Sequence, residues 1–338
     1  GFALGLWLPK AWYRRDRWLS LLSPVSWLFQ QLAGRKRRRS ETHQARYQSP
    51  IPIIVVGNIT AGGTGKTPVV IALANWLTQE GYKPGVISRG FGGSTKQAIR
   101  VTAGSDPALV GDEPLMIEAS TGVPTICCRD RVQAAAQLNE TTDCNVIISD
   151  DGLQHYRLHR DIEIAVVDAT RGLGNGRMLP SGALRESPSR LSQVDFVVLN
   201  GSGADIAAEI GLVGAHQIEL QALGLRNIAS NLIVPVNAWE GGVKVHAVCG
   251  IGHPERFAQT LKELGFEVIL SSVNDHQHLS DDDLEFGDDL PMIITSKDAV
   301  KYRGVIPDNL WVLEVEMSIS EDFVHSLAEQ AGLTITAT

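Results

Sequence analysis

Residues 55–68 of the chain read VVGNITAGGTGKTP, a glycine-rich stretch between an apolar run and a helical pattern. The stretch nearly matches the P-loop pattern G-x-x-x-x-G-K-[ST], but Thr60 stands where the first glycine belongs. The loop is close to the deviant P-loop form K-G-G-x-G-K-T, with Ala61 in place of the extra lysine. Backbone N–H groups of Gly62, Gly63 and Gly65 can face phosphate oxygens in front of a helix N-terminus. We therefore expect a phosphate cradle.

The cradle predicts the roles of the residues around it. Lys66 would bridge the β- and γ-phosphates of a nucleotide, and the Thr67 hydroxyl would ligate Mg²⁺. The predicted ATP-binding residues form one continuous run, namely Thr60, Ala61, Gly62, Gly63, Thr64, Gly65, Lys66 and Thr67.

Strand and helix signals alternate after residue 50. Apolar runs rich in β-branched residues predict strands at 51–56, 84–88, 123–128, 145–149, 162–168 and 194–199. Helical periodicity predicts helices at 68–80, 113–120 and 131–139. This alternation is typical of the α/β class and predicts a P-loop NTPase-like, mostly parallel sheet covered by helices.

A second and smaller α/β pattern follows a less regular region. It consists of a helix at 254–264 and strands at 243–249, 266–270, 291–295 and 310–315. We expect an N-terminal amphipathic segment at 1–45, a P-loop domain at 46–220, and a smaller C-terminal α/β domain with linker strands at 221–338.

The first 50 residues differ from the rest in charge and in aromatic content. They carry ten Lys and Arg residues against two acids, whereas the whole chain has a net charge of −8. Four of the seven tryptophans also lie there, namely Trp7, Trp12, Trp18 and Trp27. The uncharged stretch 18–34 is too polar for a spanning helix, and no signal-peptide cleavage site follows it.

We interpret residues 1–45 as a segment that binds an anionic membrane surface through an interfacial helix. Its basic run at 35–39, RKRRR, could contribute about 1 kcal/mol per residue near an anionic leaflet. The alternative is an ordinary helix packed on the core with a solvated basic turn. A nucleic-acid partner is disfavoured because the positive charge is local and the body is acidic.

The cysteines indicate a reducing compartment. None of the four forms a C-x-x-C pair or a zinc spacing, so they read as buried thiols of a cytosolic protein: Cys127, Cys128, Cys144 and Cys249.

Two aspartates follow the apolar run at 145–149. Asp150 and Asp151 stand where a Walker-B strand places its Mg²⁺-binding carboxylates. The alternative is a pair of aspartates that only caps a turn. Because a P-loop lies upstream, we favour the metal site.

Three further stretches contain candidate site residues. Asp112, in the GDEP stretch at 111–114, is an N-cap by its position alone, or else a carboxylate that takes a proton from an acceptor hydroxyl. His276 belongs either to a surface turn or to a site that faces the nucleotide across a cleft between the domains. Arg89 and Arg185 could each bind a substrate phosphate or could be solvated surface charges.

Taken in order, these stretches resemble the tetraacyldisaccharide 4'-kinases of lipid A synthesis. The resemblance extends from about residue 55 to residue 301, and the order of its motifs makes it more specific than any one of them. It rests on VGNITAGGTGKTP, SRGFGG, GDEP, DDGLQH, LPSGALRE, GIGHPERF, DHQ and TSKD.

This resemblance implies an enzyme and its substrate. It implies Mg²⁺-dependent transfer of the ATP γ-phosphate to the 4'-hydroxyl of a tetraacyldisaccharide 1-phosphate, a lipid A precursor. It also implies a peripheral or monotopic protein at the cytoplasmic face of the bacterial inner membrane, with its two domains joined by a two-stranded linker. No obligate protein partner is evident.

The resemblance also assigns residues to roles. Asp112 is implied to be the catalytic base, His276 its partner, and Lys66 the phosphate-binding lysine. Asp150 and Asp151 are implied to lie at the Mg²⁺ site. The residues implied to line the substrate site are Gln154, His155, Arg185 and Glu186.

The main rival is a membrane-associated P-loop ATPase switch that hydrolyses ATP and signals through its conformation. Ala61 argues against it, because dimerising switches of this kind carry a lysine at that position. A GTPase is disfavoured because the stretch 295–298, TSKD, has its aspartate one position too early for N-K-x-D.

Overall fold

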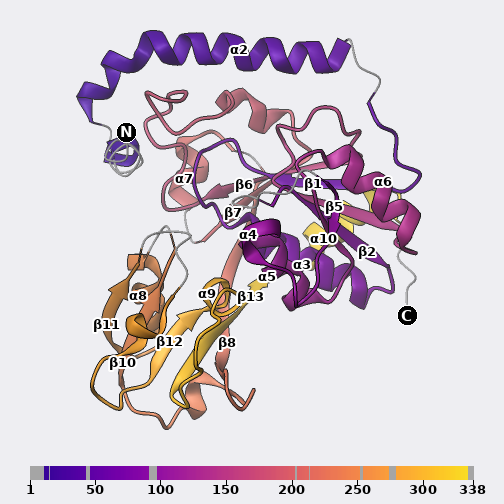
Figure 1. Ribbon diagram of the computed structural model, residues 1–338. Helices are drawn as coiled ribbons and strands as arrows, with labels where there is room; N and C mark the ends of the chain where they lie inside the picture. The colour runs from indigo at the N-terminus through magenta and orange to yellow at the C-terminus, as the bar shows by residue number, and fades with distance from the viewer. Residues whose placement is uncertain are drawn as a thin grey trace.

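The computed structural model describes residues 11–14, 16–42, 46–90, 97–201, 204–212, 214–251, 254–273 and 279–333. Figure 1 shows a larger region around a central sheet, a smaller region at one end, and the long helix α2 along one side.

The strands of the larger region follow the predicted order along the chain. Their bounds are β1 (Ile53–Gly57), β2 (Pro84–Ser88), β3 (Ile99–Arg100), β4 (Thr125–Cys127), β5 (Val146–Asp150), β6 (Ile162–Asp168) and β7 (Phe196–Asn200). The linker and smaller region contain β8 (His216–Asn227), β9 (Ile233–Val234), β10 (Lys244–Cys249), β11 (Glu267–Ser272), β12 (Met292–Thr295) and β13 (Leu310–Ser318).

Helices separate many of these strands along the chain. The α-helices are α2 (Ser23–Thr42), α3 (Lys66–Gln79), α4 (Pro107–Val110), α5 (Asp112–Thr121), α6 (Arg131–Thr141), α7 (Ala204–Glu209), α8 (Pro254–Glu263), α9 (Ser296–Ala299) and α10 (Glu321–Gln330). Short 3₁₀ turns are η1 (Arg17–Leu22), η2 (Pro188–Ser192), η3 (Val236–Ala238) and η4 (Asp281–Leu284).

The described strands lie side by side in the order β11-β10-β12-β13-β8-β7-β6-β1-β5-β2-β4-β3. In the larger region β1 is central and runs parallel to both β5 and β6. Strands β2 and β7 extend this parallel set on either side. The predicted α/β class with a mostly parallel sheet is confirmed. Because the strands are parallel, the carboxyl ends of β1, β2, β5, β6 and β7 meet at one edge, where α/β proteins bind ligands.

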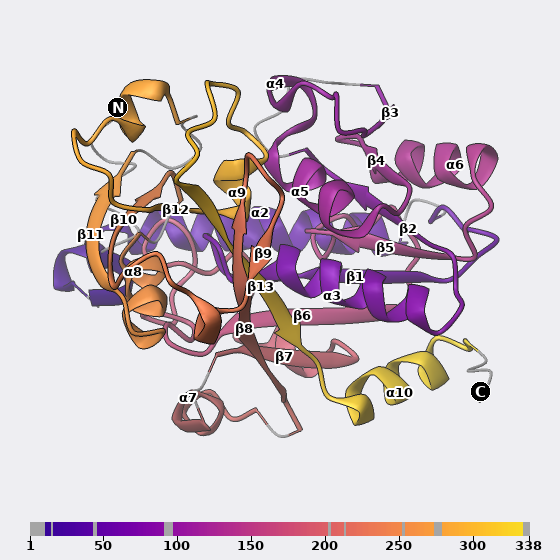
Figure 2. The same cartoon turned by 90° about the horizontal axis from the view of Figure 1, so that it is seen from below.

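Apolar side chains cover both faces of this sheet. One buried cluster joins sheet residues such as Ile54 and Val56 to Leu73 of α3 and Phe323 of α10. The other cluster lies on the opposite face and includes Leu138 of α6. Figure 2 shows α3 and α10 on one side of the sheet and α2 on the far side. The sheet edge that carries the candidate site therefore rests on two packed layers.

The long strand β8 connects the two regions. It pairs in parallel with β7 through its first residues and antiparallel with β13 along the rest of its length. Strands β8 and β13 thus form a two-stranded connection between the larger and the smaller sheet. After β13 the chain returns, and α10 packs in the core of the larger region. The division into domains at 46–220 and 221–338 stays a prediction. Helix α10 belongs to the second range, but its apolar residues pack in the core of the larger region.

The N-terminal segment packs on the larger region with one side only. Trp12 and Leu19 are buried in a small cluster with Ala183, and Trp12 Nε1 donates to the carbonyl of Pro180 (2.9 Å). Ser26 of α2 donates to the carbonyl of Met178 (3.0 Å). In the described part of the chain no helix is both long enough and apolar enough to cross a membrane. The contacts of Trp12, Leu19 and Ser26 hold part of this segment against the larger region, and its role at a membrane surface stays a prediction.

Candidate active site

The P-loop follows β1, and two asparagine side chains brace it. Nδ2 of the buried Asn58 donates to Oγ1 of Thr64 (3.1 Å) and to the carbonyl of Gly62 (3.4 Å). Nδ2 of Asn200, at the end of β7, donates to the carbonyl of Thr64 (2.9 Å). Gly65 has φ of 84°, and a Cβ there would lie 2.0 Å from Nδ2 of Asn200. Only glycine fits this close approach, so protein contacts fix the shape of the loop.

The position that departs from the P-loop pattern is used for packing. Thr60 is buried and forms an isolated antiparallel bridge with Leu184. The N–H of Ala61 donates to the carbonyl of Ala183 (2.7 Å). The next two residues, both glycine, are exposed, so their backbone can meet a ligand. This backbone pairing attaches the loop to the segment that carries Arg185 and Glu186.

Lys66 and Asp151 face each other beside this loop. Asp151 Oδ1 lies 3.5 Å from Nζ of Lys66, and its Oδ2 lies 3.6 Å from Nη1 of Arg185. Asp151 has φ of 48°, a left-handed conformation that costs about 1 kcal/mol in a residue other than glycine. Burial by itself raises the pKa of Asp151, but Lys66, Arg185 and Arg131 outweigh burial and hold that pKa below its ordinary value. This carboxylate is therefore ionised at neutral pH.

Asp150 ends β5 and lies in a different environment. Its side chain is fully buried, and Oδ2 accepts a hydrogen bond from Oγ of Ser88 (3.1 Å). Within the described structure, Oδ1 of Asp150 has no hydrogen-bond partner. Burial, together with the negative charge of Glu113, raises the pKa of Asp150 to about 7. An extra positive charge near Oδ1 would satisfy this atom and favour ionisation.

Arg131 binds the backbone of the two aspartates. Its side chain is only 2% exposed, and Nη2 donates to the carbonyls of Asp150 (2.9 Å) and Asp151 (3.1 Å). The Arg131 N–H donates to Nε2 of His155 (3.4 Å). Burial and the charge of Arg131 lower the pKa of His155 to about 4, so this ring is neutral at pH 7. The sequence analysis missed Arg131, because nothing in the sequence distinguishes it from a surface arginine at a helix start.

Two predicted substrate-binding residues bind each other. Nε2 of Gln154 donates to Oε1 of Glu186 (2.6 Å) and to the carbonyl of Asn58 (3.0 Å). Glu186 Oε2 accepts a hydrogen bond from the Tyr156 hydroxyl (2.8 Å). This network ties the segment after β5 to the P-loop. The predicted residue Arg89 is exposed directly after β2, at the same edge of the sheet.

Asp112 is the first residue of α5, and Gly111 holds the N-cap position before it. The interpretation of Asp112 as the N-cap is therefore wrong. Its side chain is almost buried, and Oδ2 lies 3.8 Å from Nζ of Lys301 in the smaller region. The next residue, Glu113, is close enough to raise the pKa of Asp150. Asp112 thus begins its helix beside the same sheet edge as the P-loop.

One predicted residue cannot be placed, because His276 lies outside the described residues. Among the residues that are described, no group of three or more His, Cys, Asp or Glu side chains could by itself enclose a metal ion. The remaining predicted residues Lys66, Asp150, Asp151 and Arg185 do come together at the P-loop edge.

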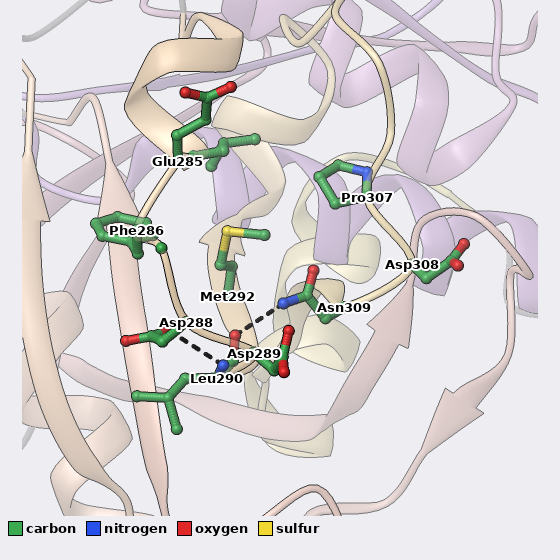
Figure 3. Close-up of a pocket in the computed structure, with 11 residues that line it drawn as sticks. Glu285, Phe286, Asp288, Asp289, Leu290, Met292, Pro307, Asp308 and Asn309 are labelled. Carbon is green, nitrogen blue, oxygen red and sulfur yellow. Dashed lines mark hydrogen bonds between the residues drawn. The ribbon is translucent and has the colours of Figure 1, made fainter.

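Two cavities lie outside the P-loop itself. The one in Figure 3, of about 570 Å³, is in the smaller region, and its lining includes Glu285, Asp288, Asp289 and Asp308. Its carboxylates make it unsuited to a nucleotide polyphosphate. The other, of about 410 Å³, lies between α2 and the segment 176–188, which carries Arg185 and Glu186. This second cavity is lined on one side by α2 and on the other by residues that include Leu184 and Ser187.

The glycine-rich loop before α3, with a lysine at the helix start and aspartates at the end of a neighbouring parallel strand, defines a P-loop nucleotide-binding protein. The model of one family, described as tetraacyldisaccharide-1-P 4'-kinase, matches residues 18–332. The chain belongs to this family. The resemblance inferred from its motifs is thereby confirmed.

Similar proteins agree with this assignment. A tetraacyldisaccharide 4'-kinase of Alkalilimnicola ehrlichii is 45% identical, over 97% of this chain and 98% of that protein. Another, of Stutzerimonas stutzeri, is 41% identical over 96% of both chains. The crystal structure of LpxK from Aquifex aeolicus in complex with ATP has a TM-score of 0.77 and 26% identity, over 94% of this chain and 99% of that one.

Proposed function

We propose that this chain transfers the γ-phosphate of ATP to the 4'-hydroxyl of a tetraacyldisaccharide 1-phosphate, the reaction named by its family. One observation carries the proposal: a single sheet edge gathers the P-loop lysine Lys66, the carboxylates Asp150 and Asp151, and the helix that begins with Asp112. A nucleotide site beside a separate carboxylate is what phosphoryl transfer to a hydroxyl requires.

The P-loop would hold the triphosphate. Its exposed glycines Gly62 and Gly63 offer backbone N–H groups, and the N-terminus of α3 favours negative charge. Lys66 lies beside Asp151 and would move to the β- and γ-phosphates when the nucleotide binds. Arg185, which also lies beside Asp151, is placed to bind a phosphate oxygen with its guanidinium group.

The residues present also fit a Mg²⁺ ion. Thr67 and Asp150 would hold it, because Mg²⁺ takes few protein ligands and completes its shell with water and phosphate oxygens. Oδ1 of Asp150, which has no hydrogen-bond partner in the described structure, supports this placement. The carboxylate of the next residue, Asp151, adds negative charge nearby. When bound, the ion supplies positive charge that offsets the charge on the transferring phosphoryl group.

Asp112 would act as the base. Its carboxylate takes the proton of the 4'-hydroxyl while that oxygen bonds to the γ-phosphorus and the bond from the γ-phosphorus to the bridging oxygen of ADP breaks. A positioned base of this kind contributes about 10²- to 10⁴-fold in rate. His276 remains the predicted partner that orients Asp112.

The acceptor would approach from the side of α2. The lining of the cavity between α2 and the segment 176–188 includes Leu184 and Ser187, which flank Arg185 and Glu186 in the sequence. We assign Arg185 and Glu186 to the acceptor site. Gln154 supports Glu186, and the neutral ring of His155 can accept or donate a hydrogen bond there. Arg89 would contact the acceptor from the end of β2. These assignments remain predictions.

We also propose that the N-terminal segment, residues 1–45, docks on an anionic membrane at the cytoplasmic face of the bacterial inner membrane. Val25, Leu28 and Leu32 are each more than half exposed, and their spacing of three and four residues places them on one face of α2. Basic residues follow at the end of the same helix. An exposed apolar face with adjacent cations is suited to a lipid interface, as in a peripheral or monotopic enzyme.

The proposed reaction is tested by following the label from γ-labelled ATP in the presence of Mg²⁺ and tetraacyldisaccharide 1-phosphate. We expect the label in the lipid product, at the 4'-position. Label that appears only as free phosphate would instead support the rival ATPase switch.

A further inference from the structure

Lys301 is a buried cation at the contact between the two regions. It follows α9, its N–H donates to the carbonyl of Asp298 (3.1 Å), and its side chain has no exposed surface. Removing an ammonium group from water is costly unless carboxylates surround it. The side chain of Lys301 must therefore have buried carboxylate partners that offset the cost of removing it from water.

The first partner of Lys301 is Asp298, which is itself fully buried and held in place. Asp298 Oδ1 lies 3.2 Å from Nζ of Lys301 and accepts a hydrogen bond from the N–H of Gly250 (3.2 Å). Its Oδ2 accepts a hydrogen bond from Oγ1 of Thr295 (2.6 Å). These contacts come from β12, α9 and the end of β10. Asp298 thus fixes Lys301 to the smaller region.

The second partner is Asp112 in the larger region. Nζ of Lys301 lies 3.8 Å from Oδ2 of Asp112, a distance suited to an ion pair but too long for a hydrogen bond. Helices α5 and α9 pack against each other at this point. Because the pair is buried, water screens it little. The ammonium group therefore acts on the side chain that we assign as the base.

We infer that Lys301 is a positioning residue for Asp112, through which the smaller region sets the orientation of the catalytic carboxylate. Asp298 holds the ammonium group, and the ammonium group holds Asp112 toward the contact between the regions. The contact between the two regions therefore contributes to catalysis as well as to stability. This inference rests on the proposed function, because it requires Asp112 to be the base.

A second ion pair between the regions provides a matched control. Nη1 of Arg256, on α8, lies 3.5 Å from Oδ2 of Asp168, and the Arg256 side chain is 45% exposed. This pair joins the same two regions without contacting Asp112. Arg256→Gln therefore tests the general effect of loosening the contact.

The test is a double-mutant cycle in the lipid kinase assay. Lys301→Met is expected to lower kcat about 10- to 100-fold, because a displaced catalytic group loses that much. The KM for ATP should stay within about 3-fold, since Lys301 does not touch the P-loop. Lys301→Arg should restore part of kcat, and Arg256→Gln should change it by less than about 5-fold.

In the Asp112→Ala background, Lys301→Met should lower the residual rate by less than about 2-fold, because the two residues act as one unit. An equal loss in both backgrounds, or an unchanged kcat in Lys301→Met alone, would overturn the inference while leaving the base assignment intact. Full turnover in Asp112→Ala alone would overturn the base assignment and the inference with it. Thermal unfolding of each variant separates loss of function from loss of fold.

Discussion

The nucleotide-binding edge of the sheet buries charged side chains, whereas the N-terminal helix α2 exposes apolar ones. At the edge, Asp150 and Arg131 are buried and fixed by strands and helix starts. On α2, apolar residues such as Leu28 and Leu32 are more than half exposed, next to a basic run. The sheet edge holds a few charged side chains in fixed positions where they can act on a substrate. Helix α2 instead leaves its apolar face exposed, where it can contact a membrane surface.

Because of this difference, substitutions in the two regions should impair the enzyme in different ways. A change at the edge should lower turnover wherever the enzyme is placed, because it alters the reacting groups. A change on the exposed apolar face of α2, at Val25, Leu28 and Leu32, should matter only when the acceptor is presented in a membrane. Substitutions of Lys66 and of the exposed face of α2 separate these two kinds of loss.

The largest effect is expected at the P-loop. Lys66→Ala removes the cation that lies beside Asp151 and should lower kcat by about 10²- to 10³-fold, both with detergent-dispersed and with vesicle-bound acceptor. Lys83→Ala is the control, because Lys83 pairs with Asp143 on the exposed surface. Comparable rates for the two variants in the lipid kinase assay would show that Lys66 does not act in the site.

A smaller and conditional effect is expected on α2. Replacing Val25, Leu28 and Leu32 together by Ser should weaken binding to anionic vesicles by about 10- to 100-fold, since each loses apolar area that would insert into lipid. Turnover of detergent-dispersed acceptor should be unchanged.

The matched control for α2 replaces three exposed apolar residues of the linker by Ser, namely Leu223, Leu232 and Ile233. Vesicle flotation measures both triple variants. Equal binding by the α2 variant and the unmodified chain would contradict the proposed membrane contact.

The smallest effect concerns the stability of the ligand-free protein. Burial raises the pKa of Asp150 to about 7, so the folded protein binds this proton more tightly than the unfolded chain does. Ionising Asp150 therefore costs folding free energy, a cost absent below pH 4 and complete above pH 7. Asp150→Asn should gain about 1–3 kcal/mol relative to the unmodified chain between these limits. Denaturant unfolding at several pH values measures this, and a constant difference would show that Asp150 has an ordinary pKa.

Much of the fold was predictable because it depends on local patterns. Apolar runs and helical periodicity located the strands β1, β5 and β6 and the helices α3, α5 and α6 within a few residues, and parallel strands then required one shared edge. The P-loop and the aspartates after β5 were predictable for the same reason. Strand β8 and helix α10 were not, because their positions depend on partners far away in the chain.

The rest of the site depends on tertiary contacts that no local pattern encodes. Lys301 and Arg131 look like ordinary surface cations in the sequence, and only folding brings them against Asp112 and Asp150. Composition identified the N-terminal segment, but it could not tell that Trp12 is buried while Trp27 is exposed. Residues that act through distant partners are therefore the ones that sequence analysis misses.

The most direct test of the central claim is label transfer by Asp112→Asn, measured together with its ATP affinity. The substitution keeps the size of the side chain and removes its ability to take a proton. We predict ATP binding within about 3-fold of the unmodified chain and a rate of transfer to the 4'-hydroxyl at least about 10²-fold lower. Undiminished transfer of label to the lipid by this variant would contradict the assignment of Asp112 as the base.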